Sequence, residues 1–369
     1  MDSYKKKSSL EQYFADNIYI MRVNSLINSF ACWLDGSGGE SNIIISSRVR
    51  LARNLKKFPF PDRAKHSKLR QIINIVTEKY ADVDDLKDSI YINVNKILEI
   101  DRQFLMERRL ISPDMVQRKL PAGLIIGKDE QVSIMINEED HLRIQSMQSG
   151  LEINKAWEAI SRIDDELSEM MEFAFSEEFG YLTACPTNTG TGMRVSIFIH
   201  LAGLSMCGKL EKIMKEKIPG EITMRGFYGE GSEALGNIFQ ISNQLTLGRT
   251  ERGILNRLIK VAESFVQMER EARQRLLKYE RIKLEDKIGR SIGVLKYAKV
   301  ISSIEVINLL SLLRLGNDIN FTNHIEKKEL NELMVLVQPA HLQKYYGKIL
   351  NSNERDILRA NLLRKKLNL

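Results

Sequence analysis

Apolar residues follow two different periods along the chain, and the period changes near residue 250. Between residues 42 and 250, short apolar runs such as NIIIS at 42–46 and QVSIMIN at 131–137 stand among helical stretches, with Gly and Pro recurring between them. In the second run, Val132, Ile134 and Ile136 alternate with other residues, which is the period of a strand. This part of the chain therefore predicts an α+β domain.

Beyond residue 253 the pattern is helical throughout. The stretch from 254 to 287 contains no Gly or Pro and places Ile254, Leu258, Val261 and Phe265 at helical intervals. A long amphipathic helix is therefore expected there. Further helical patterns cover residues 291–316, 326–347 and 353–367. We expect the C-terminal part of the chain to be all-helical.

Length and composition indicate an ordinary globular protein with room for two domains. The chain has 369 residues, a mass of 42.4 kDa and 43% hydrophobic residues. Its three cysteines, Cys32, Cys185 and Cys207, lie far apart and in no C-x-x-C spacing, which supports neither a disulfide framework nor a zinc site. The N-terminus lacks the apolar core of a signal peptide, and no charge-free run reaches transmembrane length. We expect a cytoplasmic protein, for which Met21 is an alternative start.

The net charge and the distribution of arginines indicate which kinds of molecule the protein binds. The formal net charge of +7 and the pI near 9.1 fit nucleic acid, a membrane surface or small acidic molecules. The arginines form no single basic block, and several stand alone in short polar motifs: Arg48, Arg50, Arg143, Arg194 and Arg225. This distribution favours a compact polyanion such as a nucleoside triphosphate, with neither nucleic acid nor a membrane as partner. Any one of these arginines alone is more simply explained as a surface residue.

Two predicted strands carry charged residues in arrangements that suit a site. In IIISSRVRLARN at 43–54, Arg48 and Arg50 stand two apart on an extended backbone, so both side chains point to the same side. In VSIMINEEDHLRIQSM at 132–147, the alternating strand is followed by Glu138, Glu139 and Asp140. By themselves, these acids with Arg143 after them are more simply explained as a solvated strand end than as catalytic groups.

Two glycine-containing segments add candidate chemistry. Beyond Arg225, glycines at 226, 229 and 231 let backbone N–H groups approach a phosphate, while Glu230 stays available to a cation. The segment matches neither a Walker A loop nor a dinucleotide-binding fingerprint. TACPTNTGTGMR at 183–194 is typical of an exposed turn that leads into a buried element and holds Cys185 close to Arg194. For Cys32 and Cys207, the role of a small buried hydrophobe is the simpler interpretation.

In their order and spacing, four segments resemble those of the phosphagen kinases, which phosphorylate guanidino groups. These are SSRVRLARN at 46–54, NEEDHLRIQ at 137–145, CPTNTGTGMR at 185–194 and RGFYGEGSEALGNIFQISNQ at 225–244. Within that superfamily the chain is similar to the bacterial protein arginine kinases of the McsB type, from about residue 42 to 366. RDILRA at 355–360 matches the R-D-x-x-R-A motif of their phosphoarginine pocket, which separates them from the metabolite kinases.

The resemblance implies a fold and a domain organisation. It implies a catalytic domain at residues 42–272 whose antiparallel sheet is flanked by helices, after an N-terminal segment at 1–41. A helical regulatory and dimerisation domain at 273–369 follows, in which VINLLSLLRL at 306–315 fits either a buried interface or the core of the helical bundle. The metabolite kinases carry an additional N-terminal helical domain, whereas only 45 residues precede Ser46 here, too few for such a domain.

The resemblance also implies roles for individual residues. An arginine side chain has a pKa above about 12 and must lose a proton before it attacks phosphorus. Glu139 is the implied base, Glu230 a second carboxylate against the guanidinium, and Cys185 a thiolate that positions the substrate without a covalent intermediate. ATP with bound Mg²⁺ supplies the phosphoryl group, and no metal site built by the protein itself is expected. The implied ATP-binding residues are Ser46, Ser47, Arg48, Val49, Arg50, Arg109, Arg143, Arg194, Val195, Ser196, Ile197, Phe198, Arg225, Gly226, Phe227, Tyr228 and Gly229. Among them, Arg109 replaces a histidine of the family.

The expected activity is the ATP-dependent phosphorylation of arginine side chains in proteins, which marks them for Clp-type proteolysis and serves stress regulation. The implied partners are protein substrates, an activator protein, a Clp-type protease and a second copy of the chain. Arg355, Asp356 and Arg359 are the implied allosteric phosphoarginine site, although the bare pattern also fits an ordinary charged helix face. Two alternatives remain at this point: a metabolite guanidino kinase and an inactive phosphoarginine-binding scaffold.

Overall fold

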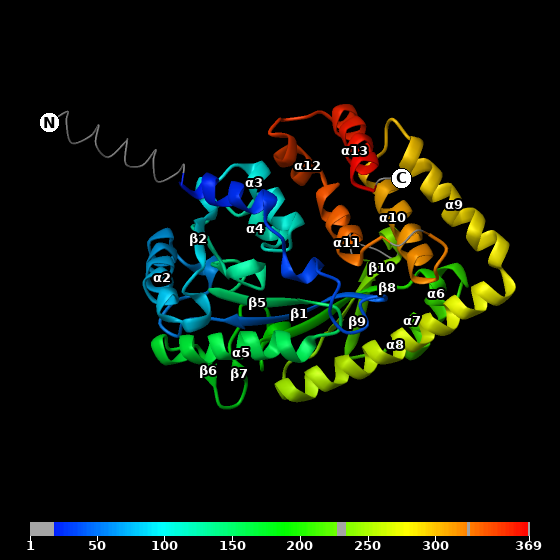
Figure 1. Cartoon of the computed structure of the whole chain (residues 1–369). Coiled ribbons are helices and arrows are strands. Elements are labelled where there is room, and N and C mark those ends of the chain that lie inside the picture. The colour runs from blue at the N-terminus through cyan, green and yellow to red at the C-terminus, as the bar shows by residue number, and fades with distance from the viewer. Residues whose placement is uncertain (1–17, 227–233, 323–324, 368–369) are drawn as a thin grey trace. The chain divides into compact units, whose positions relative to one another are not determined.

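The computed structural model describes residues 18–226, 234–322 and 325–367 of the chain (Figure 1). The chain divides into two compact units, called here the first and the second unit. The first unit comprises Met1–Ala31, Arg50–Ser146 and Trp157–Met193, and the second comprises Cys32–Val49, Met147–Ala156 and Arg194–Leu369. Each unit therefore combines segments that are far apart in sequence, whereas the expected domains are consecutive.

The first unit is built on antiparallel strands in the order β2-β3-β4-β5-β1. Their bounds are Ile90–Asn93 for β2, Gly123–Ile126 for β3, Val132–Ile136 for β4, Leu142–Ser149 for β5 and Ile44–Arg53 for β1; β1 and β5 have residues in both units. In the register, Ile134 of β4 pairs with Ile125 of β3 and with Ile144 of β5. The strand predicted from the alternation at 131–137 is confirmed as β4.

Helices flank these strands. They are α2 (His66–Lys79), α3 (Glu99–Glu107), α4 (Pro113–Gln117) and α5 (Ile153–Met170), whose first residues belong to the second unit. A two-stranded hairpin, β6 (Phe175–Ser176) and β7 (Gly180–Tyr181), follows α5. Short 3₁₀ helices occupy connections of the two units: Leu26–Asn28, Cys32–Leu34, Pro61–Arg63, Tyr80–Asp82, Asp84–Leu86, Val94–Lys96, Lys128–Glu130, Pro186–Asn188 (η8) and Leu235–Asn237.

The second unit contains antiparallel strands in the order β1-β8-β10-β9. Strand β8 spans Met193–His200, β9 spans Ile222–Gly226 and β10 spans Ile238–Asn243. Phe198 of β8 pairs with Gln240 of β10, and Gln240 pairs with Arg225 of β9, so these three residues form one row across the strands. Residues paired in this way point to the same face of a sheet.

The helices of the second unit include the predicted C-terminal bundle. They are α6 (Ala202–Met206), α7 (Leu210–Lys217), α8 (Glu251–Tyr279), α9 (Arg281–Tyr297), α10 (Ser303–Asp318), α11 (Lys327–Leu336), α12 (Pro339–Tyr346) and α13 (Ser352–Leu367). Figure 1 shows α8 as the long yellow helix, and it runs without a break through residue 272. The boundary expected between the catalytic and the helical domain therefore falls inside this helix. The single helix predicted over 254–287 is wrong in its extent, because the non-helical backbone of Glu280 separates α8 from α9.

Local sequence explains where several helices begin and end. The Thr250 side chain accepts a hydrogen bond from Gly253 N at 3.1 Å at the start of α8, and the Ser302 side chain accepts one from Glu305 N at 3.2 Å at the start of α10. Such N-caps satisfy donors that have no partner within the helix. Helix α12 ends at Gly347, whose φ of +63° is a left-handed conformation that glycine adopts without strain.

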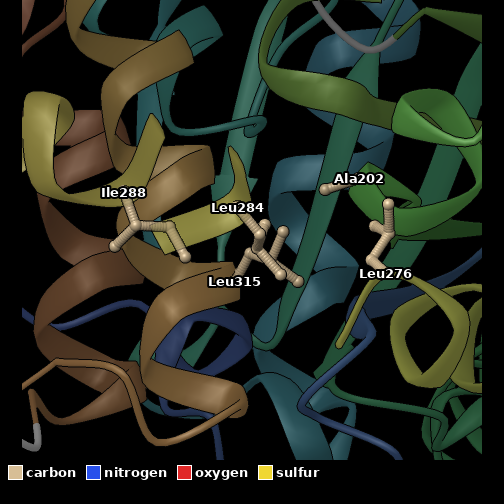
Figure 2. Close-up of a cluster of buried hydrophobic side chains, with 5 residues drawn as sticks. All are labelled: Ala202, Leu276, Leu284, Ile288 and Leu315. Carbon is tan, nitrogen blue, oxygen red and sulfur yellow. The ribbon is translucent and has the colours of Figure 1, made fainter. Parts of the chain in front are cut away.

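Apolar residues from four helices of the second unit form one buried cluster (Figure 2). It contains Ala202 of α6, Leu276 of α8, Leu284 and Ile288 of α9, and Leu315 of α10. Most apolar side chains of the 306–315 segment are buried in the single chain: Val306, Ile307, Leu310, Leu313 and Leu315. Leu309 and Leu312 are half-buried. Of the two interpretations of this segment, the structure supports the core of the bundle.

A buried polar network joins β8 to α8 and α10 in the second unit. The Glu269 carboxylate accepts Arg273 Nε at 2.7 Å, and Arg273 Nη1 donates to Asp318 Oδ2 at 3.0 Å. His200 Nε2 lies 2.8 Å from Ser311 Oγ, and burial together with the charges of nearby arginines depresses the pKa of His200 well below its ordinary value. Because an unpaired charge would be costly here, this pairing fixes the end of β8 against the helices.

No helix in the described part of the chain is long and apolar enough to cross a membrane.

Candidate active site

Glu138, the first acid after β4, is a buried anion bound to its neighbours. Its Oε1 accepts hydrogen bonds from Ser112 Oγ at 2.5 Å and from Arg143 Nη1 at 2.6 Å. Burial by itself raises the pKa of Glu138, but the Arg143 charge and the hydrogen bonds from Ser112 and the Glu139 backbone outweigh it, and the pKa lies below its ordinary value. Glu138 is therefore a structural partner of Arg143 and a poor proton acceptor.

Glu139 has the opposite environment. Its side chain is exposed. Desolvation of the carboxyl group, followed by the charges of Asp140 and Glu138, raises its pKa above the ordinary value against the opposing charge of Arg143. Its Oε2 lies 3.5 Å from Asn188 Nδ2, on the loop that begins at Cys185. An accessible carboxylate with a raised pKa is suited to accept a proton.

Asp140 fixes the loop that leads into Cys185. Its buried Oδ1 accepts hydrogen bonds from Asn54 Nδ2 and from Ala184 N, both at 2.7 Å. Asn54 Oδ1 in turn accepts the backbone N–H of His141 at 2.9 Å. Asp140 therefore couples the end of β4, the end of β1 and the segment before Cys185 into one rigid arrangement.

His141 is a structural residue in the same arrangement. Its Nδ1 accepts the backbone N–H of Leu55 at 3.0 Å, which assigns the ring proton to Nε2, and Nε2 donates to Pro59 O at 3.0 Å. Burial lowers the pKa of His141, against the hydrogen bond to Pro59. The imidazole is therefore neutral and has both nitrogens engaged, so it is no candidate for the base.

Cys185 lies on a turn that its own neighbours shape. Its side chain is half-buried, and Sγ lies 3.0 Å from Thr187 Oγ1. The Cys185 carbonyl accepts Asn188 N at 3.0 Å and Thr183 Oγ1 at 2.7 Å. The Asn188 side chain contacts Glu139. The predicted base, Glu139, therefore lies against the loop that carries the predicted thiol, Cys185.

The hairpin before this loop is joined to it through backbone atoms. Gly180 has a φ of +73°, and a Cβ at this position would lie 2.5 Å from Gly190 O, so only glycine fits. Tyr181 N donates to Gly190 O at 2.8 Å, and Gly190 N donates back to Tyr181 O at 3.3 Å. The Arg53 guanidinium lies 3.5 Å from the centre of the Tyr181 ring, and Arg53 also binds Asp164 with two nitrogens.

In the second unit, Arg48 is held on one face of the strands. Its Nε donates to Ser196 Oγ and its Nη2 donates to Gln240 Oε1, each at 3.3 Å. Its guanidinium carbon lies 5.1 Å from the centre of the Phe198 ring. The side chain is almost fully buried among these partners, which fix its direction.

Strand register places two more predicted arginines on this face. Arg225 pairs with Gln240, the residue that holds Arg48. Arg194 alternates with Ser196 and Phe198 along β8 and therefore points to their side of the strand. We call Arg48, Arg194 and Arg225 the arginine face of the second unit. Three guanidinium groups on one face suit a polyanion such as a triphosphate.

Other predicted ATP-binding residues of β1 and β8 are buried. Three have apolar side chains and can offer a ligand only their backbone groups: Val49, Val195 and Ile197. Ser46 is buried as well. Ser47 Oγ donates to Gly150 O at 2.7 Å and accepts the backbone N–H of Glu152 at 3.1 Å, which gives its hydroxyl a structural task.

The remaining predicted site residues fall in several places. Arg50 and Arg143 are half-buried in the first unit. Arg109 has a left-handed backbone with φ of +66°, and its carbonyl accepts Gln145 Nε2 at 2.7 Å. Gly226 ends β9. Four predicted residues of the glycine segment lie outside the described residues: Phe227, Tyr228, Gly229 and the proposed second carboxylate Glu230.

The RDILRA motif lies within α13 (Ser352–Leu367). Arg359 is fully buried, with Nε donating to Val337 O at 2.8 Å and Nη1 donating to Ile301 O at 2.9 Å and to Asp356. Arg355 is half-buried and donates to Leu350 O at 2.8 Å. The two arginines therefore differ, because Arg359 ties α13 to other parts of the bundle while Arg355 makes a peripheral contact.

Comparison with known proteins gives the family. The family model for the ATP:guanido phosphotransferase C-terminal catalytic domain matches residues 71–272, and that for the protein-arginine kinase McsB C-terminal domain matches residues 281–369. A protein-arginine kinase from Halothermothrix orenii is 43% identical over 353 residues, which cover 95% of this chain and all of the relative. The chain belongs to the protein-arginine kinases. Relatives with the same name from Pelotomaculum thermopropionicum and Bacillus cereus are 43% and 40% identical, over 92% and 94% of this chain and 96% and 99% of theirs.

Solved structures connect this protein-arginine kinase to the wider guanidino kinase fold. A lombricine kinase matches with a TM-score of 0.57 and 26% identity, over 66% of this chain and 71% of that chain. A duplicated taurocyamine kinase from Schistosoma mansoni matches with a TM-score of 0.55 and 25% identity, over 67% of this chain and 37% of that chain. The expected fold class, antiparallel strands flanked by helices with a helical C-terminal part, is confirmed.

Sequence reasoning missed two residues that organise the site, Asn54 and Gln240, and gave Asp140 no structural role. Asn54 and Asp140 hold the loop of Cys185, and Gln240 holds Arg48. Each stands inside a quoted motif, and Gln240 is a polar residue between apolar neighbours on a strand, which is a usable signal for a functional face. Among the described residues, no group of three or more His, Cys, Asp or Glu side chains is arranged to hold a metal ion.

Proposed function

We propose that this chain transfers the γ-phosphoryl group of ATP to arginine side chains of proteins, with Glu139 as the base. The observation that carries the proposal is the environment of Glu139, an accessible carboxylate with a raised pKa beside the loop of Cys185. The wider support is the 43% identity to a protein-arginine kinase over 95% of the chain. A guanidinium becomes a nucleophile only when a proton leaves, and this carboxylate is suited to take it.

The phosphoryl transfer itself calls for positioning and for neutralisation of negative charge. We assign ATP binding to the arginine face of the second unit, because strand register places its three arginines on one side and Ser196, Phe198 and Gln240 direct the guanidinium group of Arg48. The donors on this face suit phosphate oxygens and are not metal ligands. Mg²⁺ therefore fits as an ion carried on the phosphates of the nucleotide, where it offsets their charge.

In the first unit, Cys185 and Glu139 act on the substrate guanidinium. The arginine nitrogen that loses its proton to Glu139 forms the bond to the γ-phosphorus, and the bond between that phosphorus and the bridging oxygen of ADP breaks. We propose that Cys185 is a non-covalent partner of the guanidinium, since a group that only orients needs no bond to phosphorus. Glu230 remains the proposed second carboxylate.

We also propose specific partners and a form of regulation for this chain. The match of residues 281–369 to a C-terminal domain named for protein-arginine kinases supports proteins as substrates. An activator protein, a Clp-type protease, stress regulation, homodimer formation and phosphoarginine control through Arg355 and Asp356 are proposed on the same family membership. Arg355 and Asp356 are half-buried, whereas Arg359 is fully buried and occupied inside the bundle, so Arg355 is the more accessible arginine of the motif.

A single assay tests the function. The full chain is incubated with Mg-ATP and, separately, an unfolded arginine-containing protein, free arginine or creatine, and acid-labile, base-stable phosphate is located by mass spectrometry. We expect phosphate on protein arginines alone.

Each other result has a distinct meaning. Phosphate on the free guanidino compound but not on protein would make the chain a metabolite kinase, as the solved lombricine and taurocyamine kinases are by name. If arginine-containing proteins received no phosphate while ATP and phosphoarginine both bound, the scaffold alternative would replace the proposal.

A further inference from the structure

The hairpin of β6 and β7 exposes aromatic side chains to solvent directly before the loop of Cys185, called here the catalytic loop. Phe175 is 56% exposed and Phe179 is 45% exposed. Figure 1 shows the hairpin and its connecting loop at the lower edge of the view, beyond α5. Two large apolar side chains exposed within five residues of one hairpin suggest a surface that meets a partner. The mechanism assigned to Glu139 and Cys185 gives these two rings no task.

The base of the hairpin is rigid, so its position relative to the catalytic loop is fixed. Tyr181 exchanges two backbone hydrogen bonds with Gly190, and the Phe175 ring packs edge-on against the Tyr181 ring at 5.2 Å. At the tip, Ser176 Oγ accepts the backbone N–H groups of residues 178 and 179, each at 3.3 Å. A surface held this firmly can bind a partner without a large ordering cost.

Charge indicates the chemistry of that partner. The tip carries Glu177 and Glu178, both exposed, between the two phenylalanines. Residues 172–181 contain three acids and no Lys or Arg, in a chain whose formal net charge is +7. The third acid, Glu172, is paired with Lys56 at 2.6 Å, so the two glutamates at the tip carry the local negative charge. An acidic tip with aromatic rings on both sides complements a cationic segment that also has apolar residues.

We propose that this hairpin binds the polypeptide on one side of the target arginine and selects extended, cationic segments that contain apolar residues. The inference rests on the proposed function and names its substrate class. Cys185 follows Tyr181 by four residues, so the hairpin base and the thiol are separated by at most about 14 Å. An extended substrate covers that distance with about four residues at roughly 3.3 Å each. The flanking segment recognised by the hairpin is therefore close to the target arginine.

The test compares two peptides of equal length that share one central arginine and several leucines. One has lysine flanks and the other has glutamate flanks, and N-acetyl-arginine amide serves as a substrate without flanks. In the full chain, Glu177→Lys with Glu178→Lys should lower kcat/KM for the lysine-flanked peptide by about tenfold and raise it for the glutamate-flanked peptide. For N-acetyl-arginine amide, kcat/KM should stay unchanged. Phe179→Ser should lower kcat/KM for both peptides, since it removes apolar contact from each.

The matched control is Asp82→Lys with Asp88→Lys, two exposed acids before β2 that give the same change of charge. It should leave the preference between the peptides unchanged. Binding of the same peptides with citrulline in place of arginine, followed by fluorescence anisotropy, gives a second readout that needs no catalysis. It should show the same loss for the lysine-flanked peptide.

The outcomes separate this inference from the proposed function. If the wild-type chain phosphorylates protein arginine but the hairpin variants keep its peptide preference, the hairpin proposal is wrong and the function stands. If the wild-type chain phosphorylates no arginine in any peptide or protein, the proposed function fails first. A change of oligomeric state in light scattering, with peptide preference intact, would make the hairpin a contact with a second copy and overturn the proposal.

Discussion

Glu138 and Glu139 are adjacent in sequence, yet the pKa of the first lies below its ordinary value and the pKa of the second lies above it. Arg143 and Ser112 bind the buried Glu138, whereas the carboxyl group of Glu139 is partly desolvated and faces the charges of Asp140 and Glu138. Neighbouring carboxyl groups with opposite shifts are typical of sites in which one group holds the structure and the other exchanges a proton.

Glu139→Gln should remove the base and keep the shape of the side chain. We expect kcat to fall by about 10²-fold to 10⁴-fold, the usual contribution of a positioned base, with ATP affinity unchanged because Glu139 contacts no phosphate in this assignment. Single-turnover kinetics and ATP titration measure the two quantities. Unimpaired turnover would show that another group takes the proton.

The assignment of Glu139 as the base also predicts how activity changes with pH. Activity needs ionised Glu139, and its raised pKa moves the acid limb of kcat/KM to a higher pH than an ordinary glutamate would give. The exposed Asp114 is one of the charges that raise this pKa, so Asp114→Asn should move the acid limb to lower pH. A limb that stays in place in this variant and in Glu139→Gln would belong to another group.

At the scale of elements, the strands of the second unit separate a polar face from an apolar one. Arg194, Ser196 and Phe198 alternate along β8 with Val195, Ile197 and the other buried apolar residues of that strand. Gln240 continues the polar face on β10 and binds Arg48 at 3.3 Å. Strand alternation thus fixes where the arginine face lies, and one amide fixes where an arginine on it points.

Gln240→Ala should release Arg48 from one of its partners. We expect KM for ATP to rise about threefold to tenfold, which corresponds to one modest hydrogen bond, with kcat changed less. Gln240→Glu should raise KM further, because a carboxylate neutralises the arginine that is meant for phosphate. Steady-state kinetics with varied ATP measure both, and equal KM values in all three proteins would contradict a positioning role for Gln240.

Sequence periodicity predicted β4 and the C-terminal helices because each buries one regular face. It could not supply Asn54 as a partner of Asp140, since the two are 86 residues apart and meet only after the strands pair. The alternation at 131–137 indicated a strand but not the environment of the acids that follow it. The lowered pKa of Glu138 depends on Ser112 and Arg143, which come from other elements.

For the molecule as a whole, the helical C-terminal part shares its core and polar contacts with the rest of the second unit. The apolar cluster of Figure 2 contains Ala202 and Leu276 beside residues of α9 and α10. The network of Glu269, Arg273 and Asp318 joins α8 to α10. The amphipathic pattern predicted a helix that continues across residue 272 but not the break at Glu280 between α8 and α9, because no Gly or Pro marks that position.

The two arginines of RDILRA should respond differently to replacement. Arg359→Ala leaves two carbonyl groups and Asp356 without their donor, and we expect a loss of about 2–4 kcal/mol in the free energy of unfolding. Arg355→Ala should cost less than about 1 kcal/mol, since it loses one contact, to Leu350 O. It should keep basal kinase activity and lose the response to added phosphoarginine.

Denaturant unfolding and activity with and without phosphoarginine measure these effects. A full phosphoarginine response in Arg355→Ala would make the motif a structural helix face. Equal stability of the two variants would show that the buried contacts of Arg359 contribute little.

The contact of Gly180 with Gly190 has a consequence for how this protein can change over generations. A side chain at residue 180 would collide with Gly190 in the loop of Cys185, so substitutions at this position are excluded. The exposed residues between 175 and 179 are under no such steric restriction, and their replacement leaves the backbone junction intact. With the substrate role proposed for the hairpin, preference for particular protein substrates can diverge between lineages at the tip while the backbone of the neighbouring loop is inherited unchanged.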